Sequence, residues 1–284
     1  MKKWLSLALA LAVALVLAAC GTSEEGGNAG EGGESKESKE SKKITVGASN
    51  VPHAEILDEA KPLLEEKGFE LDVVPFQDYV LPNQALESKE LDANYFQHIP
   101  YLESQKAEHG YDFTNAGGIH IEPIGVYSQK YKSLDELPEG ASIIMSNSVA
   151  DHGRILSMLE AEGLITLNED VEKTEATLED IKENPKKLKF DTEYEASLLP
   201  QIYNNGEGDA VLINSNYAID AGLNPLEDSI AIEDKDSPYV NVIAVRTGDE
   251  EKEGIKALVE VLRSKEIQDF ILEKYEGAVV PVSE

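Results

Sequence analysis

The chain has 284 residues and carries 55 acidic against 25 basic side chains, a formal net charge of −30 at pH 7. A surface this acidic repels phosphate backbones, which argues against nucleic acid as a partner. The chain has one cysteine, which excludes an internal disulfide.

The first nineteen residues have the layout of a secretory signal. After two lysines, an apolar stretch from Trp4 to Val16 leads to Leu17-Ala-Ala-Cys20-Gly. The stretch is shorter than the roughly 20 residues needed to span a bilayer, which favours a signal peptide at 1–19 over a membrane-spanning anchor. The small residues before Cys20 form a lipobox. We therefore expect Cys20 to be lipidated and to hold the mature chain on the extracytoplasmic face of the cell membrane.

A low-complexity segment follows the lipobox. Residues 20–43 consist almost entirely of Gly, Ser, Glu and Lys and contain the repeat ESKESKESKK. Such a composition cannot bury a core, so it predicts a flexible tether. The rest, from Ile44 to Glu284, is long enough for two modest domains.

Strand and helix signals alternate along this part of the chain. In order, we expect a strand at 44–47, a helix at 52–67, a strand at 71–76, a helix at 83–88, a strand at 93–96, a helix at 100–108, an apolar stretch at 119–127, a strand at 141–145, a helix from about 151 to 162, a helix at 178–183, a strand at 188–190, a helix at 196–203, strands at 210–213 and 239–246, and one or two helices over 253–275. The helix at 178–183 follows Thr177-Leu-Glu-Asp180, which resembles a capping box.

The alternation indicates an α/β fold with largely parallel sheets. It comes as two series, and the last segment most simply returns to the first. Two lobes joined by more than one crossing can close around a small molecule, and binding sites favour such interfaces.

Enzyme signatures are missing. The chain has no Gly-x-Ser-x-Gly elbow, no Walker loop and no complete dinucleotide fingerprint, so we expect no enzyme activity, no catalytic residues and no cofactor. The histidines lie in separate elements without metal-ligand spacing, and we assign no metal ligand among them. Three or four of them could still meet in a cleft, which keeps a metal-binding lipoprotein as an alternative: His53, His98, His109, His120 and His152.

Several longer motifs are specific enough to compare with known families. They are Asp92-Ala-Asn-Tyr-Phe-Gln-His-Ile-Pro-Tyr-Leu102, Ile121-Glu-Pro-Ile-Gly-Val-Tyr-Ser128, Gly153-Arg154, Ile213-Asn-Ser-Asn-Tyr-Ala-Ile219 and Ser237-Pro-Tyr-Val-Asn241. These motifs resemble those of the NlpA-type methionine-binding lipoproteins. The resemblance runs from about Ile44 to the C-terminal Gly277–Glu284 and includes the lipobox.

This resemblance implies the substrate-binding component of an ABC importer, which delivers methionine to a membrane permease and its ATPase. It implies a type II-like periplasmic-binding-protein fold, in which each of two lobes is a mixed sheet flanked by helices and a two-strand hinge joins them. We accordingly expect lobe I to comprise 44–123 and 241–284, and lobe II to comprise 124–240.

A free amino acid requires a fixed cation for its carboxylate and acceptors for its ammonium. Arg154 matches the family's Gly-Arg motif near the start of a predicted helix, where its planar fork suits a carboxylate. Asn216 and Asn241 match the family's asparagines, whose side-chain carbonyls can accept from an ammonium. The register of the first motif leaves Asn214 as an alternative to Asn216.

The thioether requires an apolar slot. Tyr79, Phe96 and His98 match family positions that line the side-chain pocket, where rings contact sulfur favourably. Tyr95, next to Phe96 on a strand, must face the other way.

One loop departs from the family pattern. Ser146-Asn-Ser-Val-Ala-Asp-His-Gly153 stands in place of the Pro-Asn-Asp-Pro-Thr-Asn type of loop. The ligand therefore stays open among L-methionine, D-methionine, a methionine-containing dipeptide and another small apolar amino acid. A surface adhesin or signalling lipoprotein is a further alternative.

Overall fold

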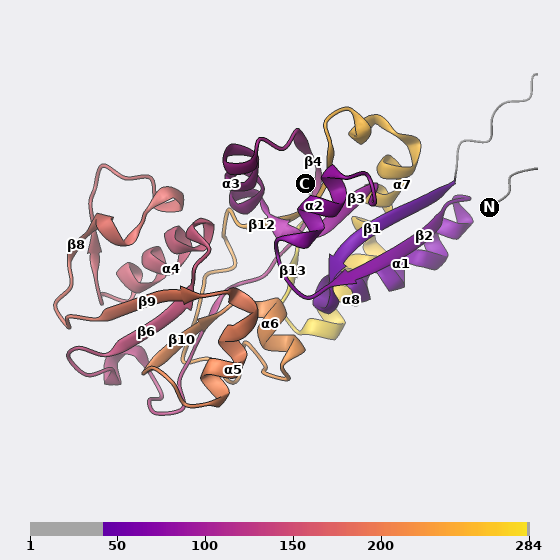
Figure 1. Cartoon of the computed structure of the whole chain (residues 1–284). Helices are drawn as coiled ribbons and strands as arrows, with labels where there is room; N and C mark the ends of the chain where they lie inside the picture. The colour runs from indigo at the N-terminus through magenta and orange to yellow at the C-terminus, as the bar shows by residue number, and fades with distance from the viewer. Residues whose placement is uncertain (1–41, 283–284) are drawn as a thin grey trace, which may run out of the picture. The chain divides into compact units, whose positions relative to one another are not determined.

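The computed structural model describes residues 42–282, which form two mixed sheets flanked by helices (Figure 1). We call each sheet with its helices a lobe, and the α/β fold in two lobes predicted from the sequence is confirmed. The predicted signal peptide, Cys20 and most of the tether lie outside the described residues. None of the helices within 42–282 is both long and apolar enough to cross a bilayer.

The first lobe contains a six-stranded sheet of order β13-β4-β12-β3-β1-β2. Strand β1 is parallel to β2 and β3, whereas β12 is antiparallel to β3 and β4. The strands are β1 (Lys43–Ser49), β2 (Glu70–Phe76), β3 (Ala93–His98), β4 (Phe113–Ile121), β12 (Val240–Arg246) and β13 (Val280–Pro281). The helices are α1 (Glu55–Glu66), α2 (Leu81–Glu87), α3 (Ile99–His109), α7 (Glu253–Leu262) and α8 (Lys265–Tyr275).

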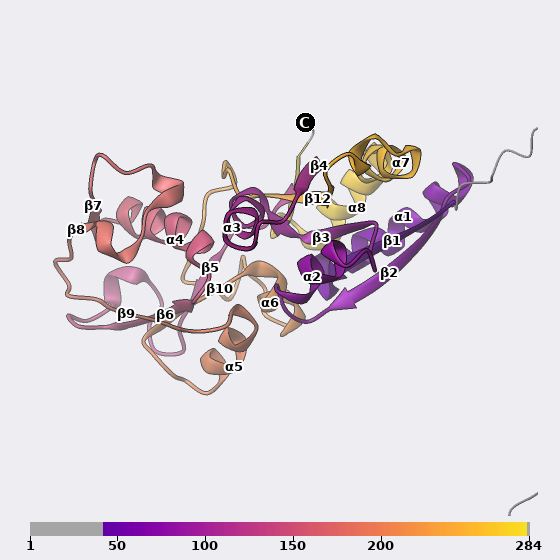
Figure 2. The same cartoon turned by 45° about the horizontal axis from the view of Figure 1, so that its top comes forward.

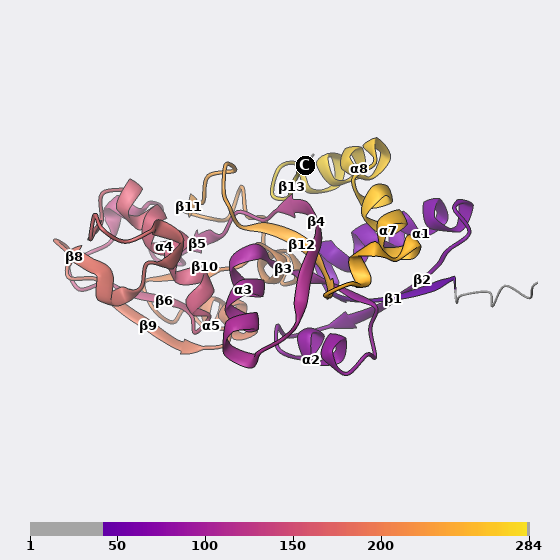
Figure 3. The same ribbon diagram turned by 90° about the horizontal axis from the view of Figure 1, so that it is seen from above.

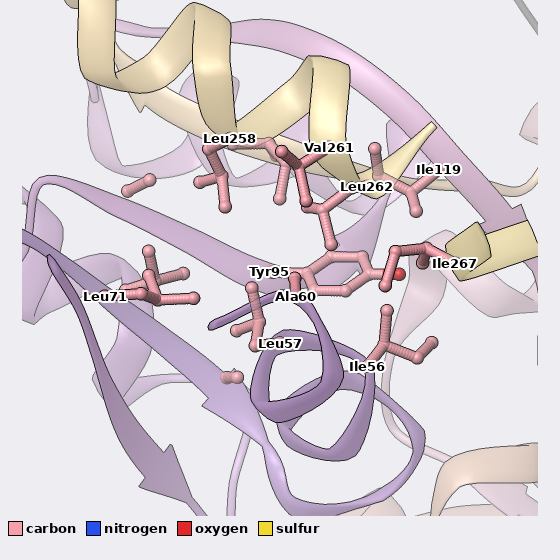
Figure 4. Packing of buried hydrophobic residues seen from close by; sticks show 14 of the residues in the cluster. Ile56, Leu57, Ala60, Leu71, Tyr95, Ile119, Leu258, Val261, Leu262 and Ile267 are labelled. Carbon is pink, nitrogen blue, oxygen red and sulfur yellow. The ribbon is translucent and has the colours of Figure 1, made fainter. Parts of the chain in front are cut away.

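The main core of this lobe lies between its sheet and helices α1, α7 and α8. Figure 4 shows Tyr95 of β3 surrounded by side chains such as Leu57 of α1 and Leu262 of α7. A smaller core on the opposite face holds Leu86 of α2 and Leu102 of α3. Figure 2 shows these two helices apart from α7 and α8. Residues of β12 enter the two cores alternately, Val242 and Ala244 the smaller one and Ile243 and Val245 the main one, so the centre of this strand is a continuous apolar run.

The second lobe contains a five-stranded sheet of order β11-β5-β10-β6-β9. Its central pairs, β10 with β6 and β6 with β9, are parallel, and β5 is antiparallel to β10. Helix α4 covers one face, and α5 and α6 contribute to a core on the other. The elements are β5 (Gly125–Tyr127), β6 (Ser142–Ser146), α4 (Val149–Ala161), β9 (Lys189–Tyr194), α5 (Leu199–Asn204), β10 (Ala210–Ile213), α6 (Ser215–Asp220) and β11 (Ala231–Ile232), with β7 (Thr166–Leu167) and β8 (Ile181–Glu183) as a separate small hairpin pair.

The chain passes between the lobes twice. The first crossing is Glu122–Ile124, between β4 and β5, and the second is 233–239, between β11 and β12. Strands β4 and β12, which flank these crossings, pair side by side (Figure 3). That the lobes move as bodies bounded near 123 and 240 stays a prediction.

One predicted helix is wrong, and several short elements were not expected, among them β7, β8, β11 and β13. The helix expected at 178–183 is wrong, because the chain makes one 3-10 turn over Leu178–Asp180 and then enters β8. The expected cap is present: Oδ2 of Asp180 accepts from the backbone N–H and the hydroxyl of Thr177, both at 2.8 Å. This cap stabilises a single turn. No amphipathic sequence follows that would extend the turn into a helix. Helix α6 was not expected, since its six residues are too few to show a helical period.

Candidate functional site

A cavity of about 380 Å³, part of which is open to solvent, lies between the lobes. Binding sites for small molecules are often found at such interfaces. All six side chains predicted to bind a ligand line it: Tyr79, Phe96, His98, Arg154, Asn216 and Asn241. The remaining lining residues are Gln97, Tyr101, Glu122, Asp151, Asn214 and Ser215. The structure therefore brings together side chains that are up to 162 positions apart, as Tyr79 and Asn241 are.

Arg154 is the cation of the cavity, and 6% of its surface is exposed. Its Nη2 lies 2.6 Å from Oδ1 of Asp151, and its Nη1 donates at 3.5 Å to Oε2 of Glu233. Burial alone would lower the pKa of Arg154, but these two carboxylates raise it well above its ordinary value. The guanidinium is therefore charged and held in one orientation, with carboxylates on two sides.

Asp151 is the acidic partner of this cation and is 1% exposed. Burial alone would raise the pKa of Asp151, but the charge of Arg154 and a hydrogen bond with His98 hold it well below its usual range. The carboxylate is thus ionised at neutral pH, which fits the pairing rule for buried charges.

Three aromatic rings of the first lobe form an aromatic wall of the cavity. Tyr79 follows β2, Phe96 lies on β3 and Tyr101 lies on α3, and their ring centroids are 6.0 Å apart in each pairing. The hydroxyl of Tyr101 donates to the backbone oxygen of Tyr79 at 3.0 Å, which fixes one ring against the other. Such a wall suits an apolar or thioether side chain.

Asn214 and Asn216 lie in the second lobe, and Asn241 lies on β12 of the first lobe. The side-chain carbonyl of Asn216 accepts from the Tyr79 hydroxyl at 2.6 Å, and Asn214 donates to Oδ2 of Asp151 at 3.3 Å. Oδ1 of Asn214 is buried and has no hydrogen-bond partner among the described residues. Since Asn214 and Asn216 both line the cavity, the register of the motif does not force a choice between them.

A buried polar cluster lies directly behind the cavity, next to Asn241. Oε1 of Glu122 lies 2.7 Å from Nε2 of His120 and 3.2 Å from Nε2 of His53. The same His53 nitrogen lies 3.1 Å from Oδ1 of Asn241, and the Tyr95 hydroxyl contacts Nδ1 of His120. Tyr95 and Phe96 therefore face opposite sides of β3, as the strand period predicts.

Burial sets the charges in this cluster. It lowers the pKa of His53 to about 4 and that of His120 to about 3, so both rings are neutral at pH 7. Burial also raises the pKa of Glu122, against the opposing effects of His53 and Arg154. The ligand atoms of His53, His120 and Glu122 lie within 4.8 Å of one another, a spacing that a metal ion could bridge. In the structure they hydrogen-bond to one another instead, and neither histidine lines the cavity.

Gly153, which precedes Arg154, sets the position of α4. A Cβ at this residue would lie 2.5 Å from the backbone oxygen of Lys173 and 2.7 Å from the backbone of Thr174. No real side chain fits there, so the glycine permits the close contact between α4 and the segment beside it.

We expect Gly153→Ala to lower the free energy of unfolding by about 1–3 kcal/mol, because overpacking against backbone outweighs the gain of about 1 kcal/mol in helix propensity. Gly254→Ala in α7 is the matched control, since the atoms nearest to its Cβ would belong to side chains, those of Ile44 at 3.1 Å and Phe69 at 3.4 Å, and not to the backbone. Urea unfolding of both variants measures the difference. Equal stabilities would show that α4 can shift freely.

Five of the twelve lining residues were not predicted from the sequence, since Asn214 had been named as the alternative to Asn216. Glu122 and Tyr101 lie inside motifs that were recognised, and Asp151 lies in the loop that departs from the family pattern. In a chain with 55 acidic side chains, however, nothing in the sequence marks Glu122 or Asp151 as buried. Only the fold supplies that information.

The model of the NlpA lipoprotein family matches residues 44–283. The chain belongs to this family. It is 54% identical to the methionine-binding lipoprotein MetQ of Bacillus subtilis (strain 168) over the whole length of both chains. It is 38% identical to the D-methionine-binding lipoprotein MetQ of Salmonella typhi, with 95% of this chain and 94% of that protein covered.

Solved structures of similar proteins have the same fold. A nutrient-binding protein from Burkholderia cenocepacia, whose structure contains methionine, aligns with a TM-score of 0.79 at 42% identity and covers 84% of this chain and 99% of its own. The resemblance found in the sequence motifs is therefore confirmed at the level of family and fold.

Proposed function

We propose that this NlpA lipoprotein captures methionine, or a close relative of it, between its two lobes and delivers it to an ABC-type importer. The relatives named above are methionine-binding or D-methionine-binding lipoproteins, which supports the ligand class. The observation that carries the proposal is the cavity itself, where a buried guanidinium, side-chain carbonyls and an aromatic wall line one space between the lobes.

Each part of a zwitterionic amino acid has a partner in this cavity. The α-carboxylate pairs with Arg154, whose fork favours bidentate contacts. The ammonium donates to the carboxylate of Glu122 and to the side-chain oxygens of Asn216 and Asn241, each of which can accept more than one hydrogen bond. The side chain lies against the aromatic wall. The wall belongs to the first lobe and Arg154 to the second, so the bound ligand joins the lobes and favours closure.

Three further features belong to the same proposal. The protein works by binding and lobe closure, without covalent chemistry and without a cofactor. Cys20 carries the lipid that holds it on the extracytoplasmic face, and its partners there are the permease and ATPase of the importer. The bodies that close are 44–123 with 241–284, and 124–240.

Isothermal titration of L-methionine into protein that has been unfolded and refolded tests the proposal, because this treatment removes ligand carried through purification. We expect saturable one-to-one binding that is stronger than for leucine or glutamine. Titration with Zn²⁺ tests the metal-binding alternative on the same sample. Heat with Zn²⁺ and none with any amino acid would overturn the proposal.

A series of methionine derivatives tests the role of the ammonium. N-acetyl-L-methionine keeps the carboxylate and thioether but loses the charge that faces Glu122. We expect its affinity to fall roughly 10- to 100-fold or more, since a hydrogen bond to a charged group contributes about 1.5–3 kcal/mol. D-methionine and methionyl dipeptides in the same series identify the natural ligand class. Equal affinity for L-methionine and its N-acetyl derivative would remove Glu122 from the site.

A further inference from the structure

One carboxylate connects the two lobes across the cavity. Oδ1 of Asp151 lies 2.6 Å from Nη2 of Arg154 and 3.0 Å from Nε2 of His98, and Oδ2 accepts from Asn214. Arg154 and Asn214 belong to the lobe of Asp151, whereas His98 ends β3 in the other lobe. The His98 contact with Asp151 therefore exists only while the lobes are together.

The hydrogen bond at Nδ1 of His98 determines that Nε2 is the nitrogen that donates to Asp151. Nδ1 accepts the backbone N–H of Tyr101 at 3.1 Å, because His98 is the N-cap of α3. Nδ1 is consequently unprotonated, and Nε2 carries the hydrogen that it donates to Asp151. The ring is also held edge-on against Tyr239, with 5.0 Å between centroids. The first lobe thus presents a fixed donor to the second.

The same carboxylate orients the cation. Arginine side chains have many rotamers, and an unpaired buried guanidinium would be costly. Asp151 lies one turn before Arg154 on α4 and takes one end of its fork, while Glu233, in the second crossing, contacts the other end at the longer distance of 3.5 Å. The position of the guanidinium therefore depends mainly on Asp151.

We propose that Asp151 is a positioning residue that couples the Arg154 cation to closure of the lobes. Its carboxylate orients the guanidinium and also accepts a hydrogen bond from Nε2 of His98 in the opposite lobe. The inference rests on the proposed function, in which Arg154 receives the ligand carboxylate. A ligand that reaches Arg154 then finds it oriented most favourably in the closed state. Closure in turn slows the release of the ligand.

The test is a double-mutant cycle on the full chain with Asp151→Asn, His98→Ala and the double variant. The isosteric Asp151→Asn keeps the packing, so it remains measurable where a smaller residue would not fold. We expect each single variant to raise the dissociation rate of L-methionine roughly 10- to 100-fold, the size of one charged hydrogen bond, and to change the association rate less than threefold. The double variant should be no worse than the worse single variant within about threefold, because Asp151→Asn removes the charge of the contact that His98→Ala removes altogether.

Two matched controls separate this coupling from general damage. His109→Ala changes an exposed histidine at the C-terminal end of α3, the helix that His98 caps. Asp209→Asn changes a carboxylate of the second lobe that accepts from Ser142 and Lys130 outside the cavity. Both should leave the dissociation rate unchanged. His98→Gln, which restores an N–H donor, should recover part of the loss.

Small-angle X-ray scattering with and without L-methionine distinguishes failure of this inference from failure of the proposed function. We expect the radius of gyration to be larger than that of the wild type, and by the same amount, in Asp151→Asn, His98→Ala and the double variant. This increase should not depend on whether the wild-type protein binds methionine. Wild-type protein without methionine affinity would overturn the proposed function alone. Two results would overturn the coupling. One is a dissociation rate of the double variant that rises by the product of the two single-variant factors. The other is a radius of gyration that equals the wild-type value in all three variants, with and without L-methionine.

Discussion

Arg154→Ala should lower the affinity for L-methionine by at least 100-fold. The substitution removes two charge-assisted hydrogen bonds to the ligand carboxylate, and each contributes about 1.5–3 kcal/mol. It also leaves Asp151 and Glu233 without their cation, so the cavity would repel a carboxylate in addition to losing its partner. Titration calorimetry at pH 7 measures the change directly.

The same substitution should also destabilise the ligand-free protein. Removing one partner of a buried ion pair typically costs about 3–5 kcal/mol, because the remaining charge is left uncompensated. Arg154→Lys keeps the charge but loses the fork, and we expect it to recover most of the stability and only part of the affinity. Arg263→Ala serves as the control for arginine loss, since Arg263 donates to the backbone oxygen of Gly118 in the first lobe. An Arg154→Ala protein that binds methionine normally would place the carboxylate elsewhere.

The parts of the fold that sequence reasoning found are those where burial leaves a local apolar signal. Strand β10, expected at 210–213, has these same bounds because all four of its residues are buried. The antiparallel return of β12 beside β3 and β4 carries no comparable signal, since pairing direction follows from the connections and not from the strand's own residues.

The site shows the same division. Arg154 and the asparagines were found through motifs, whereas Asp151 was seen only as part of an unusual loop. Its importance depends on contacts with His98, 53 positions away, and with Asn214, 63 positions away. Local patterns cannot report such pairings. A charged residue in the first turn of a helix is ordinarily solvated, so exposure is the sound expectation until the fold is known.

Acid should unfold this protein well above the pH at which its exposed carboxylates titrate. His53 and His120 are both fully buried, with pKa values lowered to about 4 and about 3, whereas an unfolded histidine titrates near 6.5. The unfolded chain therefore binds more protons than the folded chain below about pH 6.5. Stability is fully present above that pH and is lost as the pH falls toward 4.

The expected loss is large. Each histidine contributes a slope of up to about 1.4 kcal/mol per pH unit in this window, and the raised pKa of Glu122 works in the opposite sense and offsets part of it. Between pH 6.5 and pH 4.5 we expect a net loss of about 2–5 kcal/mol, a substantial share of the about 5–15 kcal/mol that stabilises a typical domain. Urea unfolding followed by circular dichroism at several pH values measures the slope.

A single substitution should change this slope in a way that loss of packing would not. His120→Gln removes one of the two protons taken up on unfolding, so the slope between pH 6.5 and 4.5 should fall by about half even if the variant is less stable at pH 7. His109→Gln, at an exposed position, should leave the slope unchanged. An unaltered slope in His120→Gln would mean that His120 is already protonated in the folded state, with Glu122 as its ion-pair partner. The cluster behind the cavity would then be charged, and the neutral hydrogen-bonded arrangement inferred from its burial would be wrong.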